Sequence, residues 1–385
     1  MSAERRRMCN VNKYRKQTLA VVAAVLIMAG LGFSASEKVE MLRIGQQAPD
    51  FNLPGVDGRS YRLADFADAD VLVIIFTCNH CPTAQAYEER IKKLAADYKN
   101  KGVAVMAISP NDPRAVRLDE LGYSDMGDSL EDMKIRAKDM GYNFPYLYDG
   151  DKQRVSLAYG PARTPHIFIF DRQRKLRYVG RIDDSEKPRL VKSRDARNAI
   201  EALLKGRKVP VEKTGTIGCS IKWASKRESA KQSSERWARE KVTVETADAK
   251  SIKELVKNNS GKLRLVNVWA SWSGPSVKQL QEFVTMNRMY RRRDFELITI
   301  SADSPKRRDK VLSILKKQQV SCRNYLYDSE DEYQLMAAVD KDLLGGIPYT
   351  ILIQPGGKVI YRRVGIIEPL ELKKAIVGYV GRYYK

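Results

Sequence analysis

The sequence predicts an α/β protein in which one unit, a mixed sheet flanked by helices, occurs twice. Three observations lead to this prediction. Short landmark sequences recur in the same order in the two halves of the chain. Apolar runs of strand length alternate with amphipathic stretches of helix length in both halves. A chain of 385 residues is longer than one typical domain requires, so each half can bury its own core.

The recurring landmarks are short, but their order and spacing agree. They are Ile108-Ser109 with Ile300-Ser301, Tyr146-Leu147-Tyr148-Asp149 with Tyr325-Leu326-Tyr327-Asp328, Thr164-Pro165 with Ile347-Pro348, and Cys78 with Ser273. The respective offsets are 192, 179, 183 and 195 residues. Extra residues in the first copy, around positions 114–127, explain the drift. The pattern therefore indicates a duplicated domain.

Each half shows the same order of expected elements. In the first half these are strand Val71–Phe76, helix Pro82–Tyr98, strand Val103–Ile108, and a hairpin of His166–Phe170 and Leu176–Val179 that turns at Asp171–Arg174. In the second half they are strand Leu263–Trp269, helix Pro275–Tyr290, strands Phe295–Ile300 and Tyr349–Ile353, a turn at Gly356-Gly357, and helix Pro369–Tyr384. A continuous apolar run such as Val71–Phe76 is typical of a strand buried on both faces. Strand, helix, strand, hairpin and helix together predict a mixed sheet covered by helices.

Composition divides the chain into four expected segments. Residues 1–36 form a targeting segment, 41–223 the first domain, 224–243 a basic linker, and 244–385 the second domain. The linker loses apolar periodicity and gains Lys, Arg, Ser and Glu. It is expected to be an exposed helix or a flexible tether that partly docks through Trp237.

The first 36 residues have the order of a secretory signal. Basic residues end at Lys16, twenty uncharged residues follow up to Ser36, and small residues stand before Glu37. This apolar run is also long enough to span a bilayer, so a cleaved signal and a retained anchor both remain open. Either one predicts an exported protein, periplasmic or anchored to the membrane.

The net charge of +22 favours anionic surfaces such as phospholipid headgroups. No nucleic-acid module accompanies the charge, so no specific nucleic-acid partner is expected. The sequence does not indicate an oligomeric state.

Cysteine spacing points to chemistry and not to a disulfide scaffold. The chain has five cysteines, and two of them, Cys78 and Cys81, stand three residues apart. A C-x-x-C pair that follows a buried strand and opens a helix lies where helix N–H groups and the helix dipole stabilise a thiolate. We therefore expect Cys78 to attack a disulfide and Cys81 to resolve the mixed disulfide.

The two histidines of the chain add to this expectation. His80 lies between the two cysteines and would place a hydrogen-bond donor and a positive charge beside the thiolate. His166 follows Pro165, and it is expected either to face the cysteine motif or to pack in the core.

The motifs of the first half resemble thioredoxin-fold redoxins, in particular the AhpC/TSA and peroxiredoxin-like branch. They are Gly45-Gln46-Gln47-Ala48-Pro49-Asp50-Phe51-Asn52-Leu53, Asp57-Gly58, Phe76-Thr77-Cys78-Asn79-His80-Cys81-Pro82 and Gly218-Cys219-Ser220-Ile221-Lys222-Trp223. The resemblance implies a cis-proline at Pro165, after Thr164, opposite the cysteines. Cys219 would be either a third redox thiol or a buried packing residue.

The second half resembles TlpA-type thioredoxin domains at residues 268–276. That family has cysteines where Ser273 and Ser276 stand here, and the resemblance therefore implies a domain without redox activity. Pro348 keeps the cis-proline position and with it a peptide-binding groove. Substrate docking, dimerisation and structural support are the roles open to this half, and Cys322 is expected to be a buried packing residue.

Three functions compete on these residues. A thiol–disulfide oxidoreductase needs only Cys78, Cys81 and Pro165, and its partners would be protein or peptide thiols and disulfides together with an upstream redox partner. A peroxidase of the peroxiredoxin type needs a Thr-x-x-Cys arrangement, which the position of Thr77 breaks, although Arg163 could supply the required charge. Neither enzyme calls for a cofactor or a metal.

The third function is a Cu(I) chaperone. It would use Cys78, Cys81, His80 and His166 as ligands, although such chaperones usually space their cysteines differently. Haem attachment is excluded because Pro82 follows Cys81 where a histidine would be needed.

Overall fold

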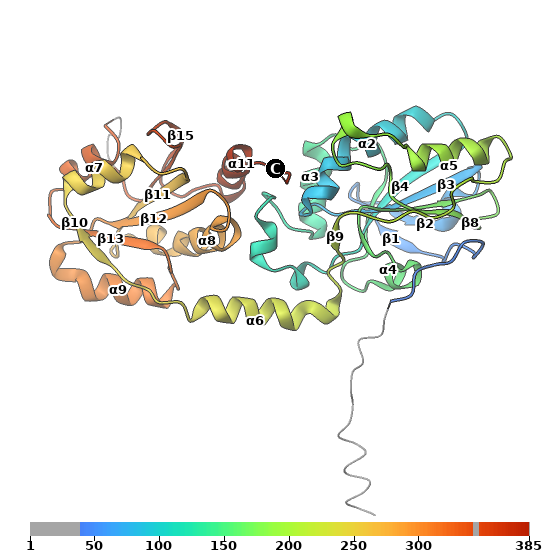
Figure 1. Ribbon diagram of the computed structural model, residues 1–385. Coiled ribbons are helices and arrows are strands. Elements are labelled where there is room, and N and C mark those ends of the chain that lie inside the picture. The colour runs from blue at the N-terminus through green and yellow to red at the C-terminus, as the bar shows by residue number, and fades with distance from the viewer. Residues whose placement is uncertain (1–38, 342–345, 385) are drawn as a thin grey trace, which may run out of the picture. The chain divides into compact units, whose positions relative to one another are not determined.

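The computed structural model describes residues 39–341 and 346–384 (Figure 1). The expected targeting segment at residues 1–36, which includes Cys9, lies outside the described residues. Among the helices that are described, none combines the length and the apolar character needed to cross a bilayer.

The first half forms a five-stranded mixed sheet. Its strand order is β5 (Tyr146–Tyr148), β4 (Val103–Ser109), β3 (Val71–Phe76), β7 (His166–Phe170) and β8 (Leu176–Gly180). The first three strands run parallel, and β7 and β8 are antiparallel to their neighbours. All six residues of the central strand β3 are buried, as its unbroken apolar sequence predicts.

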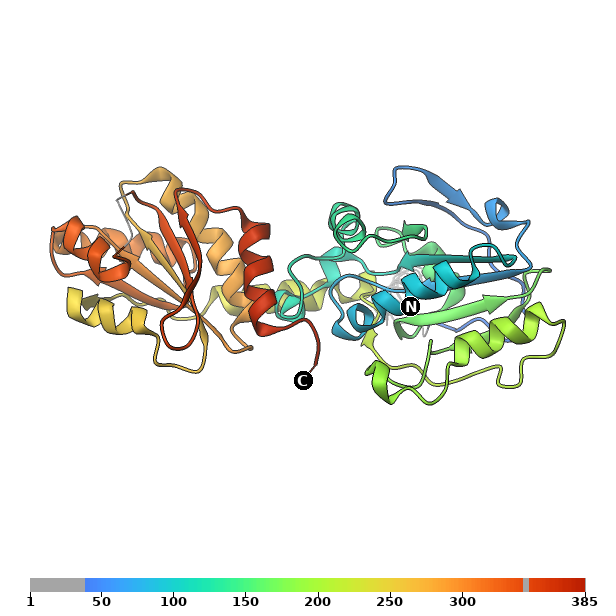
Figure 2. The same cartoon turned by 90° about the horizontal axis from the view of Figure 1, so that it is seen from above.

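Helices cover both faces of this sheet (Figures 1 and 2). One face packs against α2 (Pro82–Tyr98), α3 (Leu130–Asp139) and α5 (Asp195–Leu204), and the other packs against α4 (Arg154–Tyr159). The short strands of this half are β1 (Asn52–Pro54), β2 (Ser60–Arg62), β6 (Arg163–Thr164) and β9 (Cys219–Ser220). The sheet thus carries two apolar layers, and the cysteine motif lies where β3 ends and α2 begins.

The second half forms a six-stranded mixed sheet of the same kind. Its strand order is β10 (Glu245–Ala247), β13 (Arg323–Tyr327), β12 (Phe295–Ser301), β11 (Leu263–Trp269), β14 (Tyr349–Ile353) and β15 (Val359–Val364). Its helices are α7 (Ala249–Lys257), α8 (Gly274–Tyr290), α9 (Arg308–Lys317), α10 (Glu332–Val339) and α11 (Pro369–Val380). The expected fold class, two successive thioredoxin-like folds, is confirmed.

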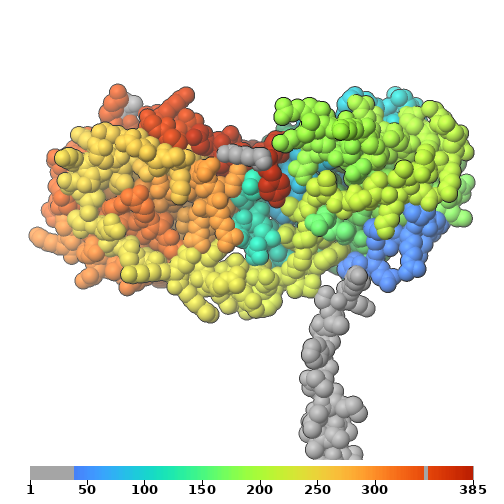
Figure 3. All heavy atoms as spheres, in the orientation of Figure 1, coloured from blue at the N-terminus to red at the C-terminus, as the bar shows by residue number. Residues whose placement is uncertain are grey.

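Helix α6 (Arg227–Ala238) occupies most of the expected linker. Most of its polar residues lie at the surface (Figure 3), whereas Ala230, Ser233 and Trp237 are buried. The guanidinium groups of Arg288 and Arg291 lie over the indole ring of Trp237, 5.7 and 5.2 Å from its centroid. The segment is therefore a helix that docks through its tryptophan.

Two expectations about the elements were wrong in detail. The last helix was expected to reach Tyr384, but α11 ends at Val380 because Gly381 takes a positive φ of 89°, which breaks the helical path. Cys322 was expected to be buried, but it is only half-buried and packs at the edge of two apolar clusters.

Candidate functional site

The cysteine motif forms a loop between β3 and α2. Strand β3 ends at Phe76 and helix α2 begins at Pro82, so residues 77–81 make the connection. Cys81 is the N-cap of α2, and its Sγ accepts a hydrogen bond from the backbone N–H of Ala84 at 3.5 Å. Pro82 stands at the first helical position, where its missing N–H costs nothing.

The helix N-terminus was expected to serve Cys78, and here the expectation was wrong. Helix α2 starts at Pro82 as expected, but its N-cap is Cys81, so the free N–H group of Ala84 points at Cys81 and not at Cys78. Burial tends to raise the pKa of the Cys81 thiol. Hydrogen bonds from Cys219 and Cys78 and the charge of His80 outweigh that effect and hold the pKa well below its ordinary value.

Cys78 has the opposite electrostatic environment. Burial raises the pKa of its thiol well above the ordinary value, and the hydrogen bond to Cys81 and the negative charge of Asp128 act in the same direction. The two thiols therefore titrate as one coupled pair, and the helix N–H and the charge of His80 favour the negative form on the Cys81 side. Both are free cysteines in this structure.

The loop at Thr164-Pro165 lies against both sulfur atoms. The Thr164–Pro165 peptide bond is cis, as the resemblance implied. The Cys78 Sγ lies 3.1 Å from the Thr164 hydroxyl oxygen, and a protonated Cys81 thiol donates to the Thr164 carbonyl oxygen at 3.3 Å. Thr77 is also buried, and its backbone N–H donates to the carbonyl oxygen of Ile108. Cys78, Cys81, Thr164 and Pro165 thus form one site.

His80 pairs with a carboxylate that sequence reasoning missed. Its Nδ1 lies 2.5 Å from Oδ2 of Asp128, and both side chains are buried. The other carboxylate oxygen accepts the backbone N–H groups of Asn79 and His80 at 2.9 and 3.2 Å, and Asn111 donates to Oδ2. Asp128 comes directly after the inserted residues, a location that could have drawn attention to it.

The two partners shift each other's pKa. Burial lowers the pKa of His80, but the charge and hydrogen bond of Asp128 prevail and raise it. Burial raises the pKa of Asp128, but the charge and hydrogen bond of His80 prevail and lower it. The charged imidazolium–carboxylate pair is therefore the favoured form. The His80 Nε2 atom is buried and has no hydrogen-bond partner among the described residues.

The structure does not bring His166 and Arg163 to the sulfur atoms. The His166 ring packs against Phe168 with centroids 4.8 Å apart, and its Nδ1 accepts the backbone N–H of Ala162. Burial lowers the pKa of His166 to about 4, so the ring is neutral at neutral pH. Arg163 is exposed and donates to the carbonyl oxygen of Gly218. Of the two expectations for His166, packing in the core is the one that agrees with the structure.

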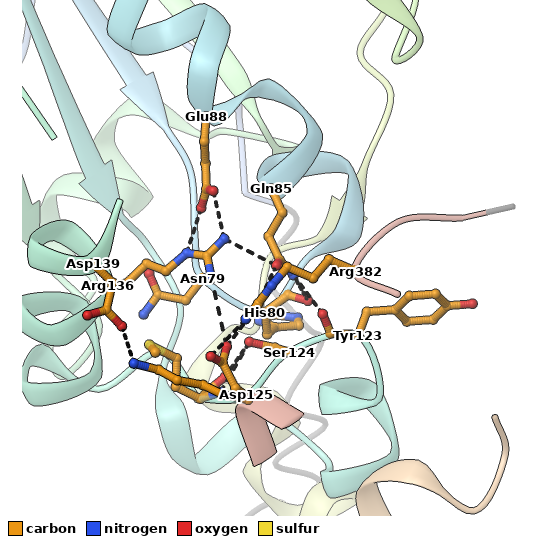
Figure 4. Close-up of polar contacts among 12 residues, drawn as sticks. Asn79, His80, Gln85, Glu88, Tyr123, Ser124, Asp125, Arg136, Asp139 and Arg382 are labelled. Carbon is orange, nitrogen blue, oxygen red and sulfur yellow. Dashed lines mark hydrogen bonds and ion pairs between the residues drawn. The ribbon is translucent and has the colours of Figure 1, made fainter. Parts of the chain in front are cut away.

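A buried ionic network borders the site on its α2 side (Figure 4). Arg136 of α3 donates from Nε and Nη2 to the two carboxylate oxygens of Glu88, at 2.9 and 2.6 Å, and from Nη2 to Gln85. Arg382, which follows α11, forms a two-point ion pair with Asp125 at 2.8 Å for each contact. These charges lie in pairs, which is the condition for burying them.

The corresponding site of the second half contains serines. Ser273 is the N-cap of α8, and its hydroxyl oxygen accepts the N–H of Ser276 at 3.4 Å and the hydroxyl of Ser276 at 2.9 Å. The Ile347–Pro348 peptide bond is cis, like its counterpart. Two hydroxyl groups cannot form a disulfide, so this site has no dithiol chemistry.

The alignment of the two sites also needs correction. The sequence pairs Cys78 with Ser273, but in the structure the two N-caps are Cys81 and Ser273, 192 residues apart. The same offset relates the paired strands, since Val71 pairs with Val103 and Leu263 with Phe295. Cys81 therefore holds the position of Ser273.

The expected copper ligands are not gathered. Among the described residues, the group that could hold a metal consists of Cys78, His80 and Asp128, whose ligand atoms lie within 4.8 Å of one another. Asp128 replaces His166 in this set, and its oxygens already accept four hydrogen bonds. A carboxylate is a hard ligand that does not match the softness of Cu(I). The donor set does not fit the copper interpretation.

Two mixed sheets, a cis-proline beside a capping cysteine, and a second cysteine one turn before it define a protein of the thioredoxin-fold class. The sequence profile of the AhpC/TSA family matches residues 44–179 and 240–362, which is more than half of the chain. The chain belongs to the AhpC/TSA family.

Named relatives agree with this class. The chain is 24% identical over 176 residues to the thiol-disulfide oxidoreductase ResA of Geobacillus thermodenitrificans, covering 44% of this chain and 89% of that one. It is 26% identical over 164 residues to the thiol:disulfide interchange protein DsbE of Yersinia pestis, covering 42% and 77%. The crystal structure of an uncharacterized conserved protein from Geobacillus kaustophilus is 43% identical, covers 48% of this chain and 94% of that one, and has a TM-score of 0.43. The expected class of enzyme, an oxidoreductase, is confirmed by the ResA and DsbE relatives.

Proposed function

We propose that the protein is a thiol–disulfide oxidoreductase whose working couple is the dithiol and disulfide of Cys78 and Cys81. The observation that carries the proposal is the meeting of two free thiols at one cis-proline loop. Cys81 caps helix α2 and accepts the N–H of Ala84, and both sulfur atoms contact Thr164, which precedes the cis-proline. Reactive cysteines need a stabilised thiolate, whereas a packing cysteine does not.

The proposal reverses the roles expected from the sequence. Cys81, which caps helix α2 and accepts the N–H of Ala84, is the attacking and leaving thiol, and Cys78 is its partner in the internal disulfide. When the Cys78–Cys81 bond forms, the two thiols lose two electrons and two protons to a partner disulfide, which becomes a dithiol. The reverse reaction oxidises a partner dithiol. Protein or peptide thiols and disulfides are the proposed substrates, and an upstream redox partner restores the couple.

His80 and Asp128 support the thiolate. The charged His80 ring favours the negative form of Cys81, and Asp128 holds that ring in its charged form. Asp128 also fixes the loop, because it accepts the backbone N–H groups of Asn79 and His80. Asp128 is therefore a positioning residue in this proposal.

We further propose that residues 41–223 form the redox domain, 224–243 the connecting segment and 244–385 a domain without redox activity. The order of residues 1–36 supports an extracytoplasmic location, where disulfides persist. The cis-proline at Pro348 supports a substrate-docking role for the second domain. The basic composition adds an anionic membrane surface as a candidate contact.

The test is reduction of a disulfide-bonded reporter peptide by the full chain. We expect Cys78→Ser and Cys81→Ser each to abolish turnover, while Ser273→Ala and Ser276→Ala leave it unchanged. Full turnover by either cysteine variant would overturn the proposal. Hydrogen peroxide is assayed in parallel, and fast peroxide consumption would favour the peroxidase. The geometry does not favour that outcome, because Arg163 donates to Gly218 and not toward the sulfur atoms.

A further inference from the structure

The two cysteines of the couple are closed to partners. Cys78 is 3% exposed and Cys81 has no exposed surface. A thiol–disulfide exchange requires the attacking sulfur to reach the sulfur that it attacks. A protein or peptide partner therefore needs another sulfur at the surface of this site. Cys219 is half-buried, so part of its side chain reaches the surface, and it packs against the cluster of Cys78, Cys81 and Ala84.

The backbone places Cys219 directly at the cis-proline loop. Strand β9 pairs with β6 in antiparallel register, with Cys219 opposite Thr164. Thr164 is the residue that contacts both sulfur atoms of the couple. Gly218 makes this approach feasible, since a Cβ atom there would lie 2.0 Å from the Thr164 carbonyl oxygen. The three cysteines thus meet around one threonine.

The segment that carries Cys219 is fixed to the same site. The backbone N–H of Lys222 donates to Asn111 at 2.9 Å, and its carbonyl oxygen accepts the N–H of Asp112 at 2.9 Å. The Lys222 ammonium group pairs with Glu120 at 2.7 Å. Asn111 in turn donates to Asp128, the partner of His80. Cys219 is therefore held in place and does not lie on a loose connection.

A role of Cys219 in packing alone explains its contacts with the site less well. Cys322 shows what such a residue looks like here, since its sulfur lies at the edge of two apolar clusters and donates to Asn324. Cys219 instead packs against Cys78 and Cys81 and lies opposite Thr164 in the pairing of β6 and β9. The neighbouring Cys81 thiol and burial both raise the pKa of Cys219.

We propose that Cys219 is a third redox thiol and the outer member of a three-cysteine relay, in which Cys81 exchanges between Cys78 inside and Cys219 at the surface. The proposal rests on the function proposed for Cys78 and Cys81 and adds the residue that meets the partner. That partner is a peptide or protein dithiol or disulfide.

The atoms and electrons of this relay balance without a further oxidant. In the oxidised protein the Cys219 sulfur attacks Cys81, the Cys81–Cys219 bond forms, the Cys78–Cys81 bond breaks, and Cys78 takes up the proton that Cys219 loses. A partner thiolate then attacks Cys219, and Cys81 leaves as the stabilised thiolate. The second thiol of the partner attacks the mixed disulfide and releases Cys219. The partner dithiol has become a disulfide, and the Cys78–Cys81 disulfide has become a dithiol.

Peptide mapping of the full chain tests whether the outer disulfide forms. Trypsin leaves Cys78 and Cys81 together in peptide 63–90 and Cys219 in peptide 214–222. After mild oxidation with diamide and alkylation of the remaining thiols, Cys78→Ser is expected to give the crosslink between these two peptides. The wild-type protein is expected to give peptide 63–90 with an internal disulfide. If Cys78→Ser leaves both peptides alkylated, the relay is wrong.

Kinetics separates the relay from the function on which it rests. Cys219→Ser is expected to keep the internal disulfide of peptide 63–90 but to reduce the reporter peptide at least about tenfold more slowly, because partner access is lost. Cys322→Ser is the matched control and should behave like the wild type. Wild-type turnover by Cys219→Ser would overturn the relay and leave the Cys78–Cys81 couple intact. Turnover that survives Cys81→Ser would overturn both proposals.

Discussion

The loop between β3 and α2 and the loop between β11 and α8 have the same backbone arrangement but carry different side chains. In the first half the N-cap of the helix is Cys81, and its sulfur accepts from the N–H three residues on, at 3.5 Å. In the second half the N-cap is Ser273, and its oxygen accepts from the N–H three residues on, at 3.4 Å. The helix N-terminus thus presents the same electrostatic environment twice, and only one half places a thiol in it.

The carboxylate beside each loop comes from a different place. In the second half Asp303, just beyond strand β12, accepts the backbone N–H of Ser271 at 2.7 Å. In the first half the residue 192 positions earlier is Asn111, which has no carboxylate. Asp128, which follows the inserted residues, accepts the loop N–H groups there. The insertion therefore brings a buried charge to the redox site and pairs it with His80.

This difference shows that a helix N-terminus alone does not make a redox site. The second loop is neutral apart from Asp303, and its serines hydrogen-bond to each other. The first loop combines a capping thiol with the charged pair of His80 and Asp128. If the comparison is right, exchanging single residues should transfer or remove the chemistry.

The largest effect is expected when cysteines replace Ser273 and Ser276, the two serines at the corresponding site of the second half. In a chain that carries Cys78→Ser and Cys81→Ser, we expect Ser273→Cys with Ser276→Cys to form a disulfide, since the two hydroxyl oxygens already lie 2.9 Å apart. The measurement is the loss of two hydrogens from tryptic peptide 265–278 after oxidation. The same chain with only Ser273→Cys is the control. Two free thiols after oxidation would show that the two frames are not equivalent.

The next effect concerns the buried ion pair beside the first site. We expect Arg136→Met to lower the free energy of unfolding by about 3–5 kcal/mol, because it leaves the buried Glu88 carboxylate without its partner. Lys134→Met, in the same helix and half-exposed, should cost no more than about 1 kcal/mol. Urea unfolding measures both. Equal effects in the two variants would contradict the importance of the buried pair.

A pH-dependent effect is expected from Asp128→Asn. His80 would lose the carboxylate that raises its pKa, and Cys81 would lose the imidazolium charge that lowers the pKa of its thiol. The ultraviolet absorbance of the thiolate should therefore appear at higher pH than in the wild type. Asp303→Asn is the matched variant of the second half and should leave this titration curve in place.

The pH dependence of the free energy of unfolding should follow from the same pair, His80 and Asp128. The raised pKa of His80 stabilises the fold below its ordinary pKa of 6.5, and this contribution is lost as the pH rises through the folded-state value. The lowered pKa of Asp128 stabilises the fold above its ordinary value of 3.8, and this is lost as the pH falls through the folded-state value. The unfolding difference between wild type and Asp128→Asn should thus be largest between pH 3.8 and 6.5. A difference that grows above that range would contradict the pair.

The smallest effect is expected at His166. His166→Leu removes the acceptor for the Ala162 N–H and should cost about 0.5–1.5 kcal/mol of unfolding free energy. Reduction of the reporter peptide should keep its wild-type rate between pH 6 and 8, because a group with a pKa of about 4 does not titrate there. A changed pH profile of turnover would show that His166 takes part in the reaction at the cysteine site.

Much of the fold could be predicted from the sequence, because buried strands and amphipathic helices leave local patterns in it. The bounds of β3, α2, β7, β11 and β14 match the predicted ones. The sites were harder to predict. The position of a helix N-cap depends on which N–H groups find other acceptors, and the Asp128 carboxylate takes those of Asn79 and His80. That contact spans 49 residues, so no local pattern shows it.

By itself, the sequence determined that the fold occurs twice, that only the first copy carries a cysteine pair, and that Thr164-Pro165 belongs to that site. These features rest on residue type and on short-range periodicity. Only the tertiary structure decided which cysteine caps the helix, which carboxylate meets His80, and that Cys219 lies beside Cys81. The physical reason is that charge and reactivity depend on neighbours brought together from distant parts of the chain, whereas strand and helix patterns depend on residues nearby in sequence.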